Sequence, residues 1–198
     1  MHHPYIKARV DQTRHAFALG DDNFSVSILN IPYVFGTAPN KEPIWRAVFV
    51  DKYKSSPKII YGNGGTTVVS AKKVAFATAQ ALEYGKHGDE LAIGSINMKL
   101  KPMIERLLRA AEIDKPVANM PTWLLGMFMK ASWKKAKKAN LDFGLDLRYL
   151  ASDILGRDFY VDFESTDLKL DMVNYHDDVD GAIDETGQLM KRLDESRA

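Results

Sequence analysis

The 198-residue chain contains no cysteine. It therefore has neither a disulfide framework nor a thiolate site, which fits a reducing compartment. It also lacks a charge excess, because 27 basic and 26 acidic residues give a formal net charge of +1. Such a balance provides no global field that would attract nucleic acid or an anionic membrane, so we expect neither as a partner.

Long hydrophobic runs are absent as well. The longest, WLLGMFM at residues 123–129, is far below the roughly 20 residues that span a bilayer. No signal-peptide pattern precedes the first predicted helix, and we therefore expect a cytoplasmic protein. The five histidines show no ligand spacing, and the acidic stretch NYHDDVDGAIDET does not match a calcium loop. We therefore predict no metal site.

What the chain does contain is an alternation of helix and strand patterns. Apolar periodicity predicts a helix over residues 5–19 with a wide buried stripe, followed by a strand over residues 24–36. Ser70 is the predicted N-cap of a later helix. Further helices are expected over residues 44–53, 71–85, 98–113 and 145–155, from Pro121, and from about Val179, with short strands over 58–61, 66–69 and 89–95. The alternation indicates an α/β or α+β protein.

The first predicted helix and strand carry a distinctive combination of residues. Tyr5 and Arg9 lie four residues apart on one helix face, and the strand ends in IPYVFG. This pattern resembles the extended short-chain dehydrogenase/reductase superfamily, the NAD-dependent epimerase/dehydratase group. Its members carry Y-x-x-x-K on such a helix, and next a strand that ends in Pro-x-x-hydrophobic-x-G. The likeness continues through IIYGNGGTTVVSAKKVAFATAQAL and the stretch that begins at His87, and it spans roughly residues 4–125.

The resemblance implies an α/β fold, the C-terminal portion of a Rossmann-like parallel-sheet fold plus a small α+β substrate-binding domain. The first part would comprise residues 1–36 and about 66–86, and the second residues 37–65 and 87–198. In the family, the N-terminal half carries the glycine-rich turn that holds the cofactor pyrophosphate. This chain shows no such turn. GNGGTT at residues 62–67 has only part of the G-x-G-x-x-G spacing and precedes a predicted strand, so we interpret it as a connecting turn.

The resemblance also implies roles for individual residues. Tyr5 would be the catalytic general acid/base, and Pro32, Tyr33 and Val34 would form a wall of the nicotinamide site for NAD or NADP. A free tyrosine has a pKa of about 10, so its ionised form needs a fixed positive charge nearby. The family's lysine supplies that charge. This chain has Arg9 instead, which holds a charge but cannot relay a proton. The serine or threonine that assists the tyrosine in the family has no counterpart among the four residues before Tyr5.

Two functions from different classes remain open. The first is an NAD(P)-dependent epimerase, dehydratase or reductase in truncated form, acting on a small carbonyl or sugar-type substrate. Contacts to that substrate are expected from the loop after Gly36 and from residues 93–98. The second is a non-catalytic binding or interaction domain that retains the C-terminal half of the fold. In the family the tyrosine-bearing helix commonly contributes to a dimer interface, so we also expect a homodimer.

A basic run follows the helix start at Pro121. The sequence KASWKKAKK at residues 130–138 places several lysines and Trp133 on one helix. Such a run suits a phosphate-rich surface. A solvated helix face is the simpler interpretation, and on the sequence alone we favour it.

Overall fold

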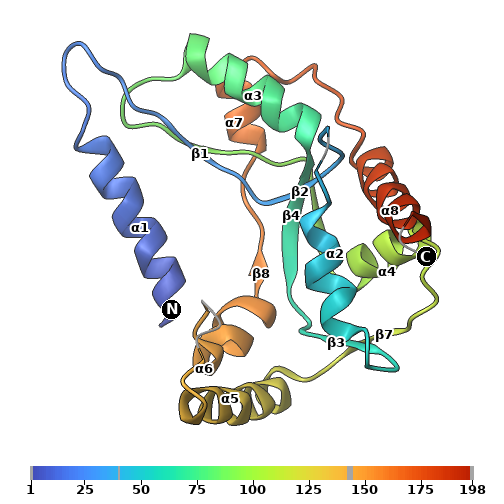
Figure 1. Cartoon of the computed structure of the whole chain (residues 1–198). Coiled ribbons are helices and arrows are strands. Elements are labelled where there is room, and N and C mark those ends of the chain that lie inside the picture. Colours follow the sequence, from blue (N-terminus) through green and yellow to red (C-terminus); the bar gives the residue numbers. More distant parts are fainter. Residues whose placement is uncertain (1, 40, 142–144, 197–198) are drawn as a thin grey trace.

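The computed structural model describes residues 2–39, 41–141 and 145–196. In Figure 1, β4 (Gly65–Ser70) runs through the centre of the molecule, with α3 (Ala71–Tyr84) above it and α8 (Val179–Glu195) to its right. The first helix, α1 (Pro4–Phe17), stands at the left of the same view. All six residues of β4 are buried, so this strand forms the centre around which the fold is arranged.

The short strands pair mainly in parallel. Their bounds are β1 (Ile28–Asn30), β2 (Tyr33–Phe35), β3 (Ile59–Tyr61), β5 (Glu90–Ala92), β6 (Ile96–Lys99), β7 (Val117–Asn119) and β8 (Asp158–Phe159). β1 pairs with β5, β3 with β7, and β4 with both β2 and β8, all in parallel, while β6 runs antiparallel to β4. Parallel neighbours need crossover connections, which the intervening helices supply. The predicted α/β class with parallel strands is confirmed.

The remaining helices lie in these crossovers and in the C-terminal third. They are α2 (Ile44–Phe49), α4 (Leu100–Ala110), α5 (Thr122–Lys138), α6 (Leu147–Leu150) and α7 (Glu164–Lys169), with a 3-10 turn η1 (Asp51–Tyr53) and a π-helical segment η2 (Ala151–Leu155). Ser70 caps α3 as predicted, because its Oγ accepts a hydrogen bond from the Lys73 N–H at 3.0 Å. Pro121 is the N-cap residue of α5, and α8 begins at Val179, so both predicted helix starts are confirmed.

Two predicted elements differ from those observed. The strand expected over residues 24–36 is interrupted between β1 and β2. Pro32 lies in the interruption, and proline has no N–H to donate to a strand ladder. The helix expected over residues 98–113 begins at Leu100, because the preceding residues form β6 against β4. Pro102 then falls in the first helical turn, where proline is tolerated.

The interior contains two clusters of buried apolar side chains. The larger one includes Phe35, Phe49 and Met190, which are fully buried. Gly187 allows α8 to approach α4 closely, since a Cβ at this position would lie 2.5 Å from the Cβ of Ala110. The smaller cluster lies where α3 covers β4 and β5, and consists of Val69, Ala77, Ala81, Leu91, Ile93, Leu170 and Met172. The division into two domains at the expected boundaries stays a prediction.

The buried stripe predicted for the first helix is wrong. α1 has no buried residue, and its Tyr5 and Val10 are 46% and 57% exposed. The helix is held at its ends instead. The ring of Phe17 meets that of His87 edge-on, with 6.2 Å between centroids, and the buried His3 precedes the first turn. The inner side of α1 faces a cavity, which is why its apolar periodicity produces no buried stripe.

Candidate functional site

The N-terminus of α1 is fixed by a buried histidine and a buried carboxylate. His3 is 1% exposed, and its Nδ1 caps the helix by accepting a hydrogen bond from the Tyr5 N–H at 3.1 Å. The backbone N–H groups of His2 and His3 both donate to Oδ2 of Asp153 in η2. The hydrogen bond from His2 is the main reason why the pKa of Asp153 lies below its ordinary value. An ionised Asp153 therefore joins α1 to η2.

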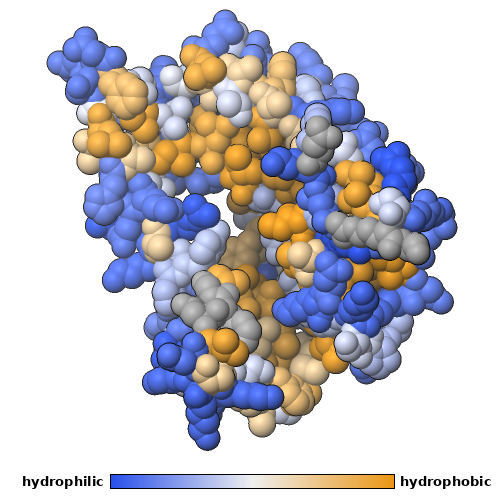
Figure 2. Space-filling view, viewed as in Figure 1, coloured by the Kyte–Doolittle hydropathy of each residue, from blue (hydrophilic) through white to orange (hydrophobic). Residues whose placement is uncertain are grey.

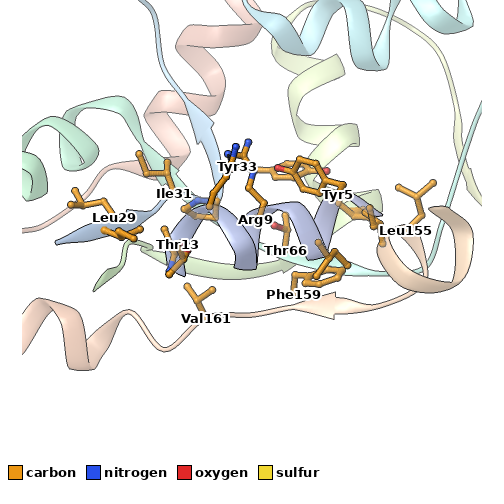
Figure 3. A pocket seen from close by; sticks show the side chains of 18 of the residues that line it. Tyr5, Arg9, Thr13, Leu29, Ile31, Tyr33, Thr66, Leu155, Phe159 and Val161 are labelled. Atoms are coloured by element: carbon orange, nitrogen blue, oxygen red, sulfur yellow. Dashed lines mark hydrogen bonds between the residues drawn. The ribbon is translucent and has the colours of Figure 1, made fainter. Parts of the chain in front are cut away.

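A cavity of about 830 Å³ lies between the inner side of α1 and the segment that links β1 to β2. Figure 2 shows a hollow in this part of the molecule. α1 contributes polar side chains, and the facing walls are mostly apolar (Figure 3). The apolar walls come from the β1–β2 segment, from η2 and from the region of β8: Leu29, Ile31, Leu155, Phe159 and Val161. An apolar pocket with a few polar groups is typical of a small-molecule site.

Tyr5 and Arg9 line this cavity from successive turns of α1 (Figure 3). The guanidinium carbon of Arg9 lies 5.1 Å from the centroid of the Tyr5 ring, a favourable cation–π arrangement. An Nη1–H of Arg9 donates to Oε1 of Gln12 at 3.1 Å, which helps to hold the guanidinium in place. Among residues 2–39, 41–141 and 145–196, no group hydrogen-bonds the Tyr5 hydroxyl. That hydroxyl is therefore available to a molecule in the cavity.

Tyr33 also lines the cavity, from β2, and two neighbours hold it. Its ring stacks on Trp45 with centroids 4.7 Å apart, and its hydroxyl interacts electrostatically with that of Tyr61. Trp45 is fixed in turn, because its Nε1–H donates to the carbonyl oxygen of Val34 at 2.7 Å. Burial raises the pKa of both Tyr33 and Tyr61. At neutral pH, Tyr33 is therefore a protonated hydroxyl in a fixed position.

The structure brings most of the predicted site residues to this one cavity. Its lining includes Tyr5, Arg9, Pro32 and Tyr33. Val34 lies apart, since its side chain packs against the smaller core cluster. The segment 93–98 and the loop after Gly36, from which substrate contacts were expected, do not line the cavity. The catalytic and cofactor-binding roles of these residues stay predictions.

Three residues that position the site were not predicted from the sequence. Trp45 belongs to a segment correctly expected to be helical, and Tyr61 to a correctly expected strand. The local sequence patterns around Trp45 and Tyr61 do not indicate that either side chain lies beside Tyr33, because these are contacts between separate elements. Asp153 lies in a segment expected to be helical, where an acidic residue is usually solvated. Only its long-range hydrogen bonds, to the start of α1, show its role.

The glycine-rich turn before β4 makes its hydrogen bonds within the chain. The Gly64 N–H donates to the carbonyl oxygen of Leu155 at 2.9 Å, and the Gly65 N–H to that of Arg157 at 3.1 Å. A Cβ at Gly62 would lie 2.1 Å from the Leu155 carbonyl oxygen, so glycine permits this close approach to η2. The prediction of a connecting turn is confirmed, and these two N–H groups are not free for a phosphate.

The described residues fit one end of a nicotinamide dinucleotide. The hydroxyls of Tyr5 and Tyr33 and the guanidinium of Arg9 stand beside apolar walls, which suits a flat ring and its ribose. In the described ranges, no glycine-rich turn opens a helix in the way that a pyrophosphate site requires. The same ranges contain no group of three or more His, Asp or Glu side chains that could hold a metal ion. Nor does any helix in them have the length and apolar character to cross a membrane.

Comparisons with known proteins support the fold. No protein-family model and no curated protein matches the chain. Among solved structures, it is similar to a nucleoside-diphosphate-sugar epimerase from Pseudomonas aeruginosa, with a TM-score of 0.61 and 14% identity. It is also similar to dTDP-glucose 4,6-dehydratases from Bacillus anthracis, in complex with NAD (0.62, 13%), and from Streptomyces venezuelae, with NAD and TYD bound (0.62, 15%).

These alignments cover nearly all of this chain but only part of each solved structure. The covered shares are 98%, 97% and 98% of this chain, against 55%, 53% and 52% of the epimerase and the two dehydratases. The chain thus spans about half the length of the structures it resembles. At these identities the likeness shows the fold, which is the Rossmann-like fold of NAD-dependent epimerases and dehydratases.

Proposed function

We propose that the chain is the catalytic and substrate-binding part of an NAD(P)-dependent epimerase, dehydratase or reductase that acts on a small carbonyl or sugar-type substrate. The observation that carries the proposal is the cavity shared by Tyr5, Arg9 and Tyr33. The likeness of fold to a sugar epimerase and two sugar dehydratases supports the same class of reaction. Because the chain spans about half of those structures, the rest of the dinucleotide site would come from a complementary half, in the same polypeptide or in another.

Tyr5 transfers the proton in this proposal. When a substrate carbonyl is reduced, the Tyr5 hydroxyl donates its proton to the carbonyl oxygen and becomes a phenolate; in the reverse direction the phenolate takes the proton back. A bound nicotinamide would supply or accept the hydride. The Arg9 guanidinium, 5.1 Å from the ring centroid, stabilises the negative charge that develops on Tyr5.

The proton returns to Tyr5 from water, because Arg9 cannot relay it. Tyr5 is 46% exposed, so solvent reaches it directly. Tyr33 offers a second hydroxyl in the same cavity. It would hydrogen-bond the substrate oxygen in place of the serine or threonine for which the chain has no counterpart before Tyr5.

A second candidate function is a non-catalytic interaction domain, and the isolation of α1 favours it. α1 has no buried residue, and in the described residues β1 is paired only with β5. An open helix side and a free strand edge are surfaces that a partner chain can cover. A homodimer would be one form of such an assembly. Tyr5 and Arg9 would then take part in binding and in no chemistry.

Titration of the purified chain with NADH and NADPH separates the two candidates. Trp45 lines the cavity, so a dinucleotide seated there should change the protein fluorescence and raise the melting temperature. Trp123→Phe, on α5 and outside the cavity lining, should leave that change intact. If binding saturates, Tyr5→Phe should bind the cofactor with unchanged affinity and lose turnover. No response to either cofactor from folded protein would reject an autonomous enzyme and would leave either a fragment that needs its complementary half or the interaction domain.

A further inference from the structure

The outward side of α5 carries a patch of apolar side chains. Trp123, Met127 and Phe128 are 69%, 61% and 58% exposed. The buried residues of this helix are Leu125 and Ala136, so the patch points away from the core. Single exposed apolar residues are common on proteins, but three within two turns of one helix form a contiguous patch that indicates an interaction surface.

The second half of α5 is strongly basic. Its lysines are Lys130, Lys134, Lys135, Lys137 and Lys138, and all are exposed. The helix contains no acidic residue. In the described parts of the chain, none of these five lysines forms an ion pair, because every lysine that does so belongs to another element. The positive charge of α5 therefore faces solvent without an ion pair to any acidic side chain that the structure describes.

Two of the apolar side chains, those of Trp123 and Met127, and three of the lysines lie on one side of the helix. Positions 123, 127, 130, 134 and 138 follow one another at spacings of three or four residues, which keeps them on one face. In Figure 1, α5 lies along the lower edge of the molecule, and no other element is drawn below it. Figure 2 shows the lower edge as hydrophobic toward the end where α5 begins and hydrophilic toward the end where it finishes.

We propose that this face, formed by Trp123, Met127, Lys130, Lys134 and Lys138, binds the surface of an anionic lipid bilayer. α5 would lie in the plane of the surface, with its apolar end in the headgroup region and its lysines on the lipid phosphates. The sequence pattern alone favoured a solvated face. The exposure of the apolar residues beside the lysines changes that interpretation, and the inference does not depend on the proposed enzymatic function.

The charge and the exposed apolar area of this face together indicate which kind of partner it binds. A soluble polyphosphate or a nucleic-acid duplex would neutralise the lysines but would leave Trp123 and Met127 in water, and a single strand that stacked a base on Trp123 would still leave Met127 exposed. An acidic protein would need, beside its charges, an apolar pocket shaped for the same two side chains. A bilayer surface supplies anionic groups and apolar depth within a few ångströms and requires no matching shape. The net charge of only +1 means that the attraction is confined to this helix.

Co-sedimentation with vesicles tests the proposal on the full chain. The vesicles are phosphatidylcholine with about 30 mol% phosphatidylserine, or phosphatidylcholine alone. We expect binding to the anionic vesicles only, and weaker binding as salt is raised from about 0.1 M to about 0.5 M. Lys134→Gln/Lys138→Gln should weaken binding by up to about 25-fold, at about fivefold per lysine. Trp123→Ser should weaken it about tenfold.

Matched controls remove the same groups elsewhere. Lys54→Gln/Lys58→Gln deletes two exposed lysines outside α5, and Leu82→Ser replaces an apolar side chain that is 87% exposed on α3. Both variants should bind like the unmodified chain. The proposal is overturned by an absence of binding, by equal binding to neutral vesicles, or by equal losses in control and α5 variants. Competition by inositol hexakisphosphate, combined with indifference to Trp123→Ser, would also overturn it, because that result identifies a phosphate site without lipid.

Discussion

Replacing Asp153 by alanine should release α1 from the rest of the protein. Asp153 is 4% exposed and accepts hydrogen bonds from the backbone N–H groups of both His2 and His3. α1 buries none of its own residues, so little apolar contact compensates for the loss of this anchor. Because Tyr5 and Arg9 lie on the first turns of α1, release of the helix end should also move both side chains out of their positions in the cavity lining.

The size of the effect follows from the two hydrogen bonds. A hydrogen bond to a charged group contributes about 1.5–3 kcal/mol. Since both donors share Oδ2, we assign about 3 kcal/mol to the pair, which corresponds to roughly a 100-fold change in the equilibrium between docked and released α1. Asp153→Asn keeps an acceptor but loses its charge, so it should cost about half as much.

Amide hydrogen exchange measures this equilibrium residue by residue. In Asp153→Ala, the protection of α1 amides should fall roughly 100-fold, while α8 amides, whose helix is anchored in the larger core cluster, should change much less. Asp158→Ala is the matched control, because it removes an exposed carboxylate whose ion pair is with Lys99 of β6 and not with α1. Unchanged protection of α1, or an equal loss in α1 and α8, would refute the anchoring argument.

Further predictions concern stability, packing and the site. Lys73 is 3% exposed and pairs with Asp167 at 2.7 Å. Lys73→Ala leaves the carboxylate unpaired and should lower the free energy of unfolding, measured by urea titration, by about 3–5 kcal/mol. Lys73→Met/Asp167→Leu removes both charges and should lower it by much less. Gly187→Ala should cost about 1–3 kcal/mol by overpacking α8 against α4, measured in the same way. The pKa of Asp153 is lower in the folded protein than in the unfolded chain. The stabilisation of the fold by this carboxylate is therefore present above the unfolded pKa of about 4 and is lost as the pH falls through the folded pKa. The melting temperatures of the unmodified chain and Asp153→Asn should accordingly converge in acid. Tyr33→Phe should leave cofactor affinity unchanged and reduce turnover about tenfold or more if its hydroxyl binds the substrate oxygen.

Elements specified by local signals could be predicted from the sequence. Ser70 is a good N-cap residue directly before an alanine-rich helix, and Pro121 and Val179 mark helix starts by composition alone. The order of helices and short strands was enough to identify the α/β class. The resemblance around Tyr5 and Arg9 also pointed to residues that the fold brings together at one cavity.

Features that depend on distant contacts could not be predicted. The apolar periodicity of the first helix predicts a buried stripe. This prediction fails because periodicity indicates which side of a helix is apolar but not whether another element covers that side. The break at Pro32 and the strand β6 both depend on which partners the neighbouring strands find. The stacking of Tyr33 on Trp45 and the anchoring of α1 by Asp153 likewise join separate elements.

The loose attachment of α1 links the anchoring argument to the proposed function. A molecule that fills the cavity contacts α1 on one side and the β1–β2 segment on the other, so part of its binding free energy stabilises the docked helix. A ligand at 100 times its dissociation constant would add about 2.7 kcal/mol, nearly the amount assigned to Asp153. Saturating dinucleotide should therefore restore most of the α1 protection lost in Asp153→Ala if the cavity is the cofactor site. If only a partner chain restores it, at a midpoint that shifts with protein concentration, the cavity is part of an interface and the interaction-domain function is the correct one.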